Sequence, residues 1–224
     1  MLKFFRIVFT GLALGFGLVI VTSTSHADTI LQPVSASTSI PVGPVGTIDN
    51  LCNQSGLSVG YTSLVDDFDS YLASNPTHDH GYGENIWGAS EGIRSGDIDF
   101  DLGGTFLIES MALWNLINDS SAIGQFNLMV DDNPAFSSAV SLGSFETSNT
   151  LGVMSNTAAE VFTFNPTSAA FVRLEILNTH SDASYAVAFS EVAFSVVPEP
   201  TALTLAVSGL LGLVLCGWRR NQSR

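Results

Sequence analysis

Basic residues are scarce in this sequence. Only 7 residues are lysine or arginine, against 21 aspartates and glutamates. Between positions 28 and 196 the two basic residues Arg94 and Arg173 face 20 acidic ones, a formal charge of 2 − 20 = −18. Such a charge repels phosphate backbones and anionic lipid headgroups, so we expect no nucleic-acid partner.

Cysteine is also scarce. The chain has 2 cysteines, Cys52 and Cys216, and Cys216 stands in an apolar segment near the C-terminus. This excludes the disulfide framework on which many small exported domains depend. We expect Cys52 to be a small buried hydrophobic residue.

Long apolar runs are confined to the two ends of the chain. The first six residues, MLKFFR, carry two positive charges, and an apolar run over 7–21 follows. Ser25 and Ala27 are the small residues that signal peptidase needs before its cut. The pattern predicts a signal peptide over 1–27, with Asp28 as the first mature residue. Because the run is short for a membrane span, cleavage is favoured over a retained anchor.

The C-terminal end has a different pattern. As a helix, residues 201–218 would be about 27 Å long at about 1.5 Å per residue, which nearly matches a hydrocarbon core of about 30 Å. Pro198 and Pro200 mark the beginning of this predicted transmembrane helix. Arg219 and Arg220 follow it, and arginine clusters stay on the cytoplasmic side. The body is therefore predicted to lie on the far side of the membrane.

Val-Pro-Glu-Pro, an apolar helix and an arginine-rich end together resemble the PEP-CTERM sorting signal of Gram-negative bacteria, here over 197–224. The resemblance implies that an exosortase in the inner membrane cuts near Pro198, Glu199 and Pro200. The protein would be anchored in the membrane until this cut and then released to the cell surface or an extracellular polysaccharide matrix.

Between the two ends, strand patterns dominate. The segment GDIDFDLGG at 96–104 alternates strictly, with three aspartates on one face. Alternation assigns these apolar residues to the core: Ile98, Phe100, Leu102, Phe126, Leu128, Val130, Phe162, Phe164, Val172, Leu174, Ile176, Val192, Phe194 and Val196. Residues 105–115 are apolar on both phases, which predicts a bulge or a strand covered on both sides.

Many short strands with regular turn signals predict an all-β fold, an antiparallel sandwich or jelly roll over 51–196. No convincing helical period is present in this body. Residues 28–50 are rich in Ser, Thr and Pro and read as a lead-in that holds at most one edge strand, because proline disfavours a central one.

The order of motifs resembles discoidin-like, galactose-binding-like domains over roughly residues 50–196. SGLSVGYTSLVDDFDSY, NIW, IDFDLGGTFLIESMALWN, FNLMVDD, FVRLEILN and FSEVAF follow one another as in that family. The resemblance implies a β-sandwich that binds carbohydrate, with Trp87 in its core. This chain departs from the family in having few basic residues for a glycan pocket.

Asp66, Asp67 and Asp69 lie close together in sequence, and calcium takes its oxygen ligands from such side chains. The resemblance adds Glu191, because related sugar-binding modules hold a structural calcium between an aspartate-rich loop and a glutamate on the last strand. We therefore expect a structural Ca²⁺ at these four residues. The alternative is three solvated turn aspartates with Glu191 at a strand edge.

The segment THDHGYGEN at 77–85 predicts a ligand-binding loop. Tyr82 lies between two glycines and could stack its ring on a sugar, with His80 beside it. Trp114 ends a strand and could serve either the core or a ligand. Two histidines in this loop could share a zinc ion, but no third one is near in sequence.

Three functions remain open. The favoured one is a non-catalytic carbohydrate-binding or adhesion module whose partners are signal peptidase, exosortase and extracellular polysaccharide. The second is an acidic structural matrix protein that calcium crosslinks without recognising a particular sugar. The third, a surface hydrolase, rests on GLSVG at 56–60 and is disfavoured, because Ser58 does not stand between a predicted strand and helix.

Overall fold

The computed structural model describes residues 28–79, 83–116, 120–148, 156–181 and 185–198. Strands make up most of them: β1 (Thr29–Leu31), β2 (Ser35–Thr38), β3 (Val42–Gly46), β4 (Thr77–His78), β5 (Trp87–Ala89), β6 (Gly96–Asn115), β7 (Ile123–Asp131), β8 (Val140–Glu146), β9 (Thr157–Ala158), β10 (Glu160–Thr179) and β11 (Ala188–Val196). The helices in these ranges are α1 (Phe68–Ala73) and the 3₁₀ turn η1 (Ile48–Leu51).

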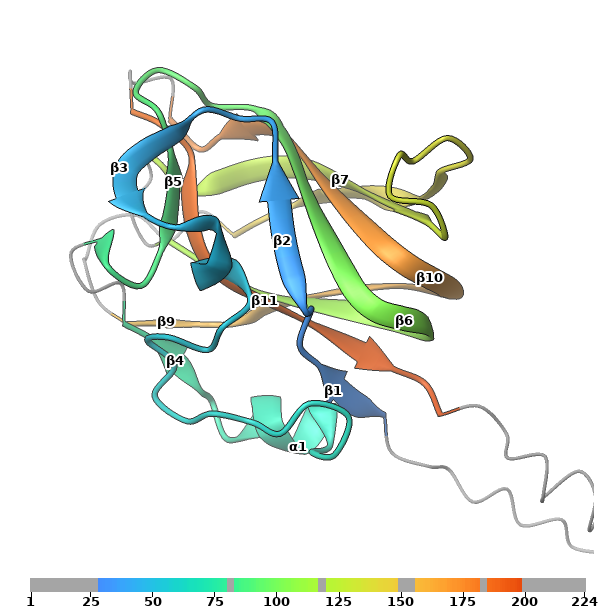
Figure 1. The fold of residues 1–224 in the computed structure, drawn as a ribbon. Helices are drawn as coiled ribbons and strands as arrows, with labels where there is room; N and C mark the ends of the chain where they lie inside the picture. Colours follow the sequence, from blue (N-terminus) through green and yellow to red (C-terminus); the bar gives the residue numbers. More distant parts are fainter. Residues whose placement is uncertain (1–27, 80–82, 117–119, 149–155, 182–184, 199–224) are drawn as a thin grey trace, which may run out of the picture.

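All strand pairs among the described residues are antiparallel, and the main sheet has the order β3-β5-β11-β6-β10-β7-β8. β1 pairs with β11 and β2 with β6, while β4 and β9 form a small sheet of their own. β6 and β10 have 20 residues each and pair along both of their halves. The sheet therefore folds back on itself around a shared core, as Figure 1 shows. The predicted all-β antiparallel sandwich is confirmed.

The two long strands bend where the sequence interrupts their pairing. One interruption falls at Gly103 and Gly104 of β6, where Gly103 has a φ of +78° and a Cβ would lie 2.6 Å from Cγ1 of Val34. Glycine adopts this left-handed conformation without strain. The other interruption includes Pro166 of β10, which has no N–H to donate. These residues allow one hairpin to serve both halves of the sandwich.

The core follows the alternation in the sequence. Every apolar residue that alternation assigned to the core is at most 8% exposed. A second, smaller cluster covers the other face of β6 and β11 and contains Ile30, Tyr61, Phe68, Tyr71, Ala112, Trp114 and Ala193. The stretch 105–115 is thus covered on both sides, and its pairing with β11 also slips between Ile108 and Ser110. Both features predicted for this stretch are present.

The lead-in 28–50 is more structured than we expected. It contributes β1, β2 and β3 to the sheet, where at most one edge strand was predicted. β2 and β3 each pair with one strand, a position that the prolines of this segment permit, while β1 pairs with β11 and also bridges Asp67. Residues 28–50 therefore belong to the folded domain rather than preceding it.

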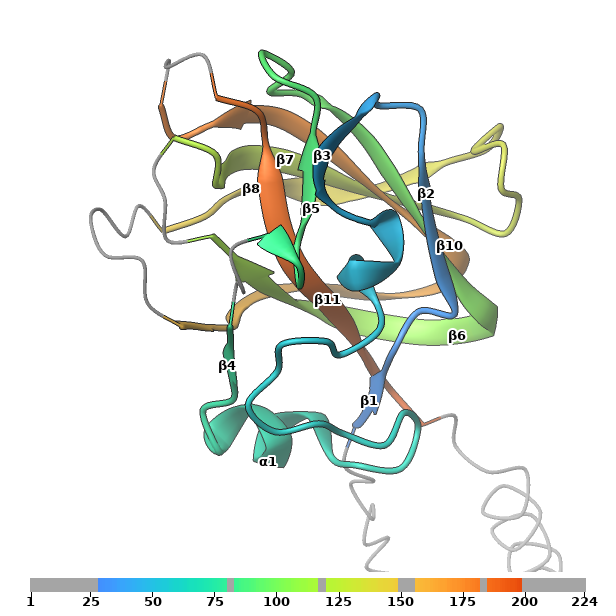
Figure 2. The ribbon, with the colours of Figure 1, turned by 60° about the vertical axis from the view of Figure 1, so that its left-hand side comes forward.

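The first and last described residues lie side by side. Thr29 pairs with Val196, and the Ser195 hydroxyl donates to a carboxylate oxygen of Asp28 over 3.0 Å. Figures 1 and 2 show both ends leaving the sandwich at the same end. In the described ranges no helix is long and apolar enough to cross a membrane. The predicted signal peptide and transmembrane helix lie outside these ranges.

Candidate functional site

Of the three residues predicted to bind a ligand, His80 and Tyr82 lie outside the described residues. The third, Trp114, is completely buried in the second cluster, and its indole N–H donates to the Pro76 carbonyl over 3.0 Å. This corrects the expectation that Trp114 contacts a ligand, because its ring has no exposed surface. The core position predicted for Trp87 is confirmed, since it is 0% exposed.

A polar pocket lies at the end of the sandwich where β7 begins and where β8 and β10 end. Its volume is about 240 Å³. We call it the loop-end pocket and define it by its lining residues Arg94, Gly124, Gln125, Glu146, Asn178, Thr179 and His180. No local sequence pattern marks this pocket, because its residues come from four separate parts of the chain.

Buried hydrogen bonds hold the floor of this pocket. The Asn115 side chain bonds both the N–H and the carbonyl of Ile123, over 3.1 and 2.9 Å. It also donates to the Thr147 hydroxyl over 3.3 Å, and Thr147 Oγ1 lies 2.7 Å from Nε2 of His180. Because the Thr147 hydroxyl donates to the Ile123 carbonyl, it accepts from the imidazole, which places a proton on Nε2. His180 is thus fixed from behind by residues that are themselves buried.

The walls of the pocket are made of paired amides and one cation. The Asn178 side chain accepts from the backbone N–H of Gln125 and donates to the Gln125 side-chain oxygen, both over 3.0 Å. Arg94 Nε donates to the Thr179 hydroxyl over 3.1 Å. The Gln125 amide also reaches the Glu146 carboxylate at 3.5 Å. The pocket therefore presents donors and acceptors in fixed positions, as recognition of a polyhydroxyl ligand requires.

An exposed aromatic ring stands on the same connection as His180. Tyr185 lies in the segment between β10 and β11 and is 61% exposed. Exposed tyrosine rings offer a flat apolar face beside a polar hydroxyl, which suits contact with a sugar ring. From the sequence we expected Tyr82 to stack on a sugar ring and did not name Tyr185. Its small neighbours Ser184 and Ala186 resemble the glycines that drew attention to Tyr82.

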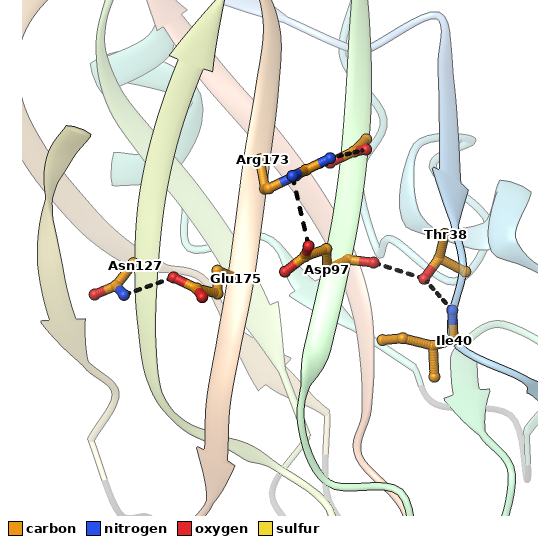
Figure 3. Close-up of polar contacts among 7 residues, drawn as sticks. Thr38, Ile40, Asp97, Asn127, Arg173 and Glu175 are labelled. Carbon is orange, nitrogen blue, oxygen red and sulfur yellow. Dashed lines mark hydrogen bonds and ion pairs between the residues drawn. The ribbon is translucent and has the colours of Figure 1, made fainter. Parts of the chain in front are cut away.

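The other arginine between positions 28 and 196, Arg173, forms ion pairs on the sheet. Arg173 forms a two-point ion pair with Asp99, over 2.6 and 2.8 Å, and lies 3.5 Å from Asp97. Its guanidinium also lies 4.2 Å from the ring centre of Phe136. Figure 3 shows Arg173 reaching Asp97, beside the hydrogen bond from Asn127 to Glu175. The acids of 96–104 thus line an outer face, as alternation predicted, while Arg94 lines the loop-end pocket.

The four predicted calcium ligands are held apart. Asp66 accepts from the Thr62 N–H over 2.7 Å, and Asp67 caps α1 by accepting from the Ser70 N–H over 2.7 Å. Hydrogen bonds from the side chain and then the backbone of Ser70 lower the pKa of Asp67, while Asp69 lies in the first turn of α1. Within the described ranges, no three acidic, histidine or cysteine side chains gather closely enough to hold a metal ion. A short helix that the sequence analysis missed accounts for the positions of the aspartates.

Glu191 is far from solvent on β11. Its side chain is 0% exposed, and Oε2 accepts from the backbone N–H of Gln54 over 3.0 Å. The other oxygen, Oε1, has no hydrogen-bond partner among the described residues. Burial raises the pKa of Glu191 to about 8, so the group is mostly a neutral acid at pH 7. A proton on Oε1 matches this pattern, because the Gln54 N–H donates to the other oxygen, Oε2.

The serine of GLSVG has a structural environment unlike a nucleophile. Ser58 is exposed, its backbone N–H donates to the Thr77 carbonyl over 2.7 Å, and its hydroxyl accepts from the Thr77 N–H over 2.9 Å. It stands between no strand and helix, which a nucleophile elbow requires. Cys52 is buried as expected, and burial raises its pKa to about 12, so the thiol is not reactive either.

No known family and no characterised protein matches this sequence. Solved structures with a similar fold include the CBM32 of AlyQ in complex with 4,5-unsaturated mannuronic acid, at 19% identity and a TM-score of 0.44, covering 75% of this chain and 98% of that one. Another is CpGH89CBM32-5 from Clostridium perfringens in complex with GalNAc-β-1,3-galactose, at 16% identity and a TM-score of 0.45, covering 73% and 94%. A truncated AlyQ with CBM32 and alginate lyase domains matches at 16% identity and a TM-score of 0.45; 77% of this chain is covered, but only 35% of that one.

Proposed function

We propose that this chain is an exported, non-catalytic carbohydrate-binding module and that the loop-end pocket is its binding site. The observation that carries the proposal is the pocket's construction. Amide, imidazole, guanidinium and carboxylate groups line one hollow, and buried hydrogen bonds fix several of them. Sugar hydroxyls both donate and accept, so a rigid mixture of donors and acceptors suits them. The discoidin-like order of the sequence motifs supports the same function.

The pocket holds groups that bind rather than groups that react. The Thr147 hydroxyl, which contacts His180, is 3% exposed and donates its hydrogen bond to the Ile123 carbonyl. A hydroxyl in that position is neither accessible to a substrate nor activated by the imidazole. The geometry therefore favours binding over hydrolysis at this site.

The test is binding of the purified full-length chain to a glycan panel and to the host's own extracellular polysaccharide. We expect saturable binding to a few sugars, reduced at least tenfold by His180→Ala and by Asn178→Ala. Asn133→Ala is a matched control, because Asn133 follows the far end of β7, about 30 Å from the pocket at about 3.4 Å per residue. If Asn133→Ala weakened sugar binding as much as Asn178→Ala does, the assignment of the pocket as the binding site would be wrong.

The second candidate is an acidic matrix protein that calcium condenses without recognising a sugar. The charge of −18 over residues 28–196 and the acids on the outer face favour it. Light scattering with calcium, in the presence and absence of the best sugar, separates the two. Calcium-driven association together with no binding on the glycan panel would establish the matrix function instead.

A further inference from the structure

The family resemblance places calcium between the aspartate-rich loop and Glu191 on the last strand. The structure instead brings the segment after η1 against Glu191, through the Gln54 N–H. In this chain, side-chain amides fill that junction, and their orientation can be deduced. The backbone N–H of Tyr61 donates to Oε1 of Gln54 over 2.9 Å, which fixes the Gln54 amide. Its Nε2 must then donate, and it reaches the Tyr61 carbonyl at 3.0 Å and Oε1 of Gln32 at 2.6 Å.

The orientation of Gln54 determines that of Gln32. Because Oε1 of Gln32 accepts from Gln54, Nε2 of Gln32 is the donor, and it donates to the Cys52 carbonyl. The backbone N–H of Gln32 is held in turn by the Ser63 hydroxyl over 3.0 Å. Two backbone carbonyls near Glu191, those of Cys52 and Tyr61, thus already accept from amides.

The backbone itself is also arranged as a donor toward Glu191. Gln54 has a φ of +62°, a left-handed conformation that is uncommon outside glycine, and its N–H donates to Oε2 of Glu191. An N–H group cannot ligate a cation, whereas calcium needs six to eight oxygens. Asp66 and Asp67, which could supply more oxygens, instead accept from the backbone N–H groups of Thr62 and Ser70.

We propose that the amides of Gln32 and Gln54, with the Gln54 N–H on Glu191, replace a calcium ion at this junction, so that the folded chain does not depend on calcium. The amides fasten β1, the segment after η1 and the segment around Tyr61 to β11. They hold these segments together, as a bound calcium ion would. Gln32, Gln54 and Glu191 therefore form a metal-free clasp at this junction.

Two measurements on the full-length chain test this clasp. Thermal unfolding, followed by the fluorescence of the buried tryptophans, should give the same Tm in millimolar calcium and in excess EDTA. Terbium, a calcium mimic that nearby Tyr61 and Trp114 would sensitise, should give the same weak emission in the wild type and in Glu191→Gln. A calcium-dependent rise in Tm, or terbium emission that Glu191→Gln removes, would overturn the proposal.

Gln54→Met keeps the length of the side chain and removes its polar groups, so it tests the positive part of the proposal. We expect it to lower the Tm by several degrees, and added calcium should recover none of the loss. Asn53→Ala is the neighbouring control, because the exposed Asn53 side chain contacts only its own turn. Equal Tm values for Gln54→Met and the wild type would show that the amides do not fasten the junction.

Discussion

Glu191→Gln should flatten the pH dependence of folding stability between about pH 4.5 and pH 8. The pKa of Glu191 is about 8 in the folded chain, against an ordinary value of 4.5 that the unfolded chain retains. Within that window the unfolded carboxyl loses its proton and the folded one keeps it. Stability from this group is therefore complete below pH 4.5 and falls by about 1.4 kcal/mol per pH unit as the pH rises toward 8.

The total effect is large on the scale of a single domain. The separation between 4.5 and about 8 corresponds to roughly 5 kcal/mol, comparable with the lower end of the 5–15 kcal/mol that typically holds a domain folded. The other ionisable groups that face Glu191 are Cys52, Tyr61 and Tyr71, whose pKa values burial raises. These three groups keep their protons throughout the window and add no slope there.

The assay is urea unfolding of the wild type and of Glu191→Gln at a series of pH values from 5 to 8. The difference in unfolding free energy between the two should change by roughly 4 kcal/mol across the series. Subtracting the two unfolding free energies removes the contributions of other groups. The main one is Glu109, because its hydrogen bond with Asp28 raises the pKa of Glu109 to about 7. Glu91→Gln, on the surface, should leave the wild-type slope intact. Parallel pH profiles for the wild type and Glu191→Gln would refute the reasoning.

Two further predictions concern the helix cap and the chain ends. Asp67→Ala removes the oxygen that accepts from the Ser70 N–H at the start of α1, so it should lower the midpoint of urea unfolding. Asp69→Ala should lower the midpoint less, because Asp67 and not Asp69 is the N-cap residue. Mass spectrometry of the exported protein should find Asp28 as its first residue and its last within 198–200. A mature form that retains 201–218 would contradict the sorting prediction.

Sequence alone predicted the sandwich well, because alternation directly reports which side chains face the core. Every apolar residue that alternation assigned to the core is buried, but β11 is buried at all 9 of its positions, which alternation did not predict. The prediction of secondary structure failed at short elements, where the sequence pattern is weak. α1 has six residues, too few to show a helical period, although Asp67 followed by Ser70 is a capping pair in retrospect.

The candidate site was less predictable for a different reason. Trp114 looked available because it ends a strand, but a loop from elsewhere in the sequence covers its other face. The loop-end pocket combines residues from as far apart as Arg94 and His180, and no local pattern announces that combination. Likewise, the amides of Gln32 and Gln54, which we propose take the place of calcium beside Glu191, carry no charge and form no motif.

β11 also determines how the domain would stand on a surface. The strand begins beside Ser121 and ends against Thr29, where the chain enters and leaves the sandwich. Its 9 residues span about 30 Å, so a chain held by either terminus would present the loop-end pocket outward, at the tip. Neighbouring copies would then present their pockets in parallel to one polymer. Such an array can gain about 10²–10⁴ in avidity, which would let a weak individual site hold a long polysaccharide firmly.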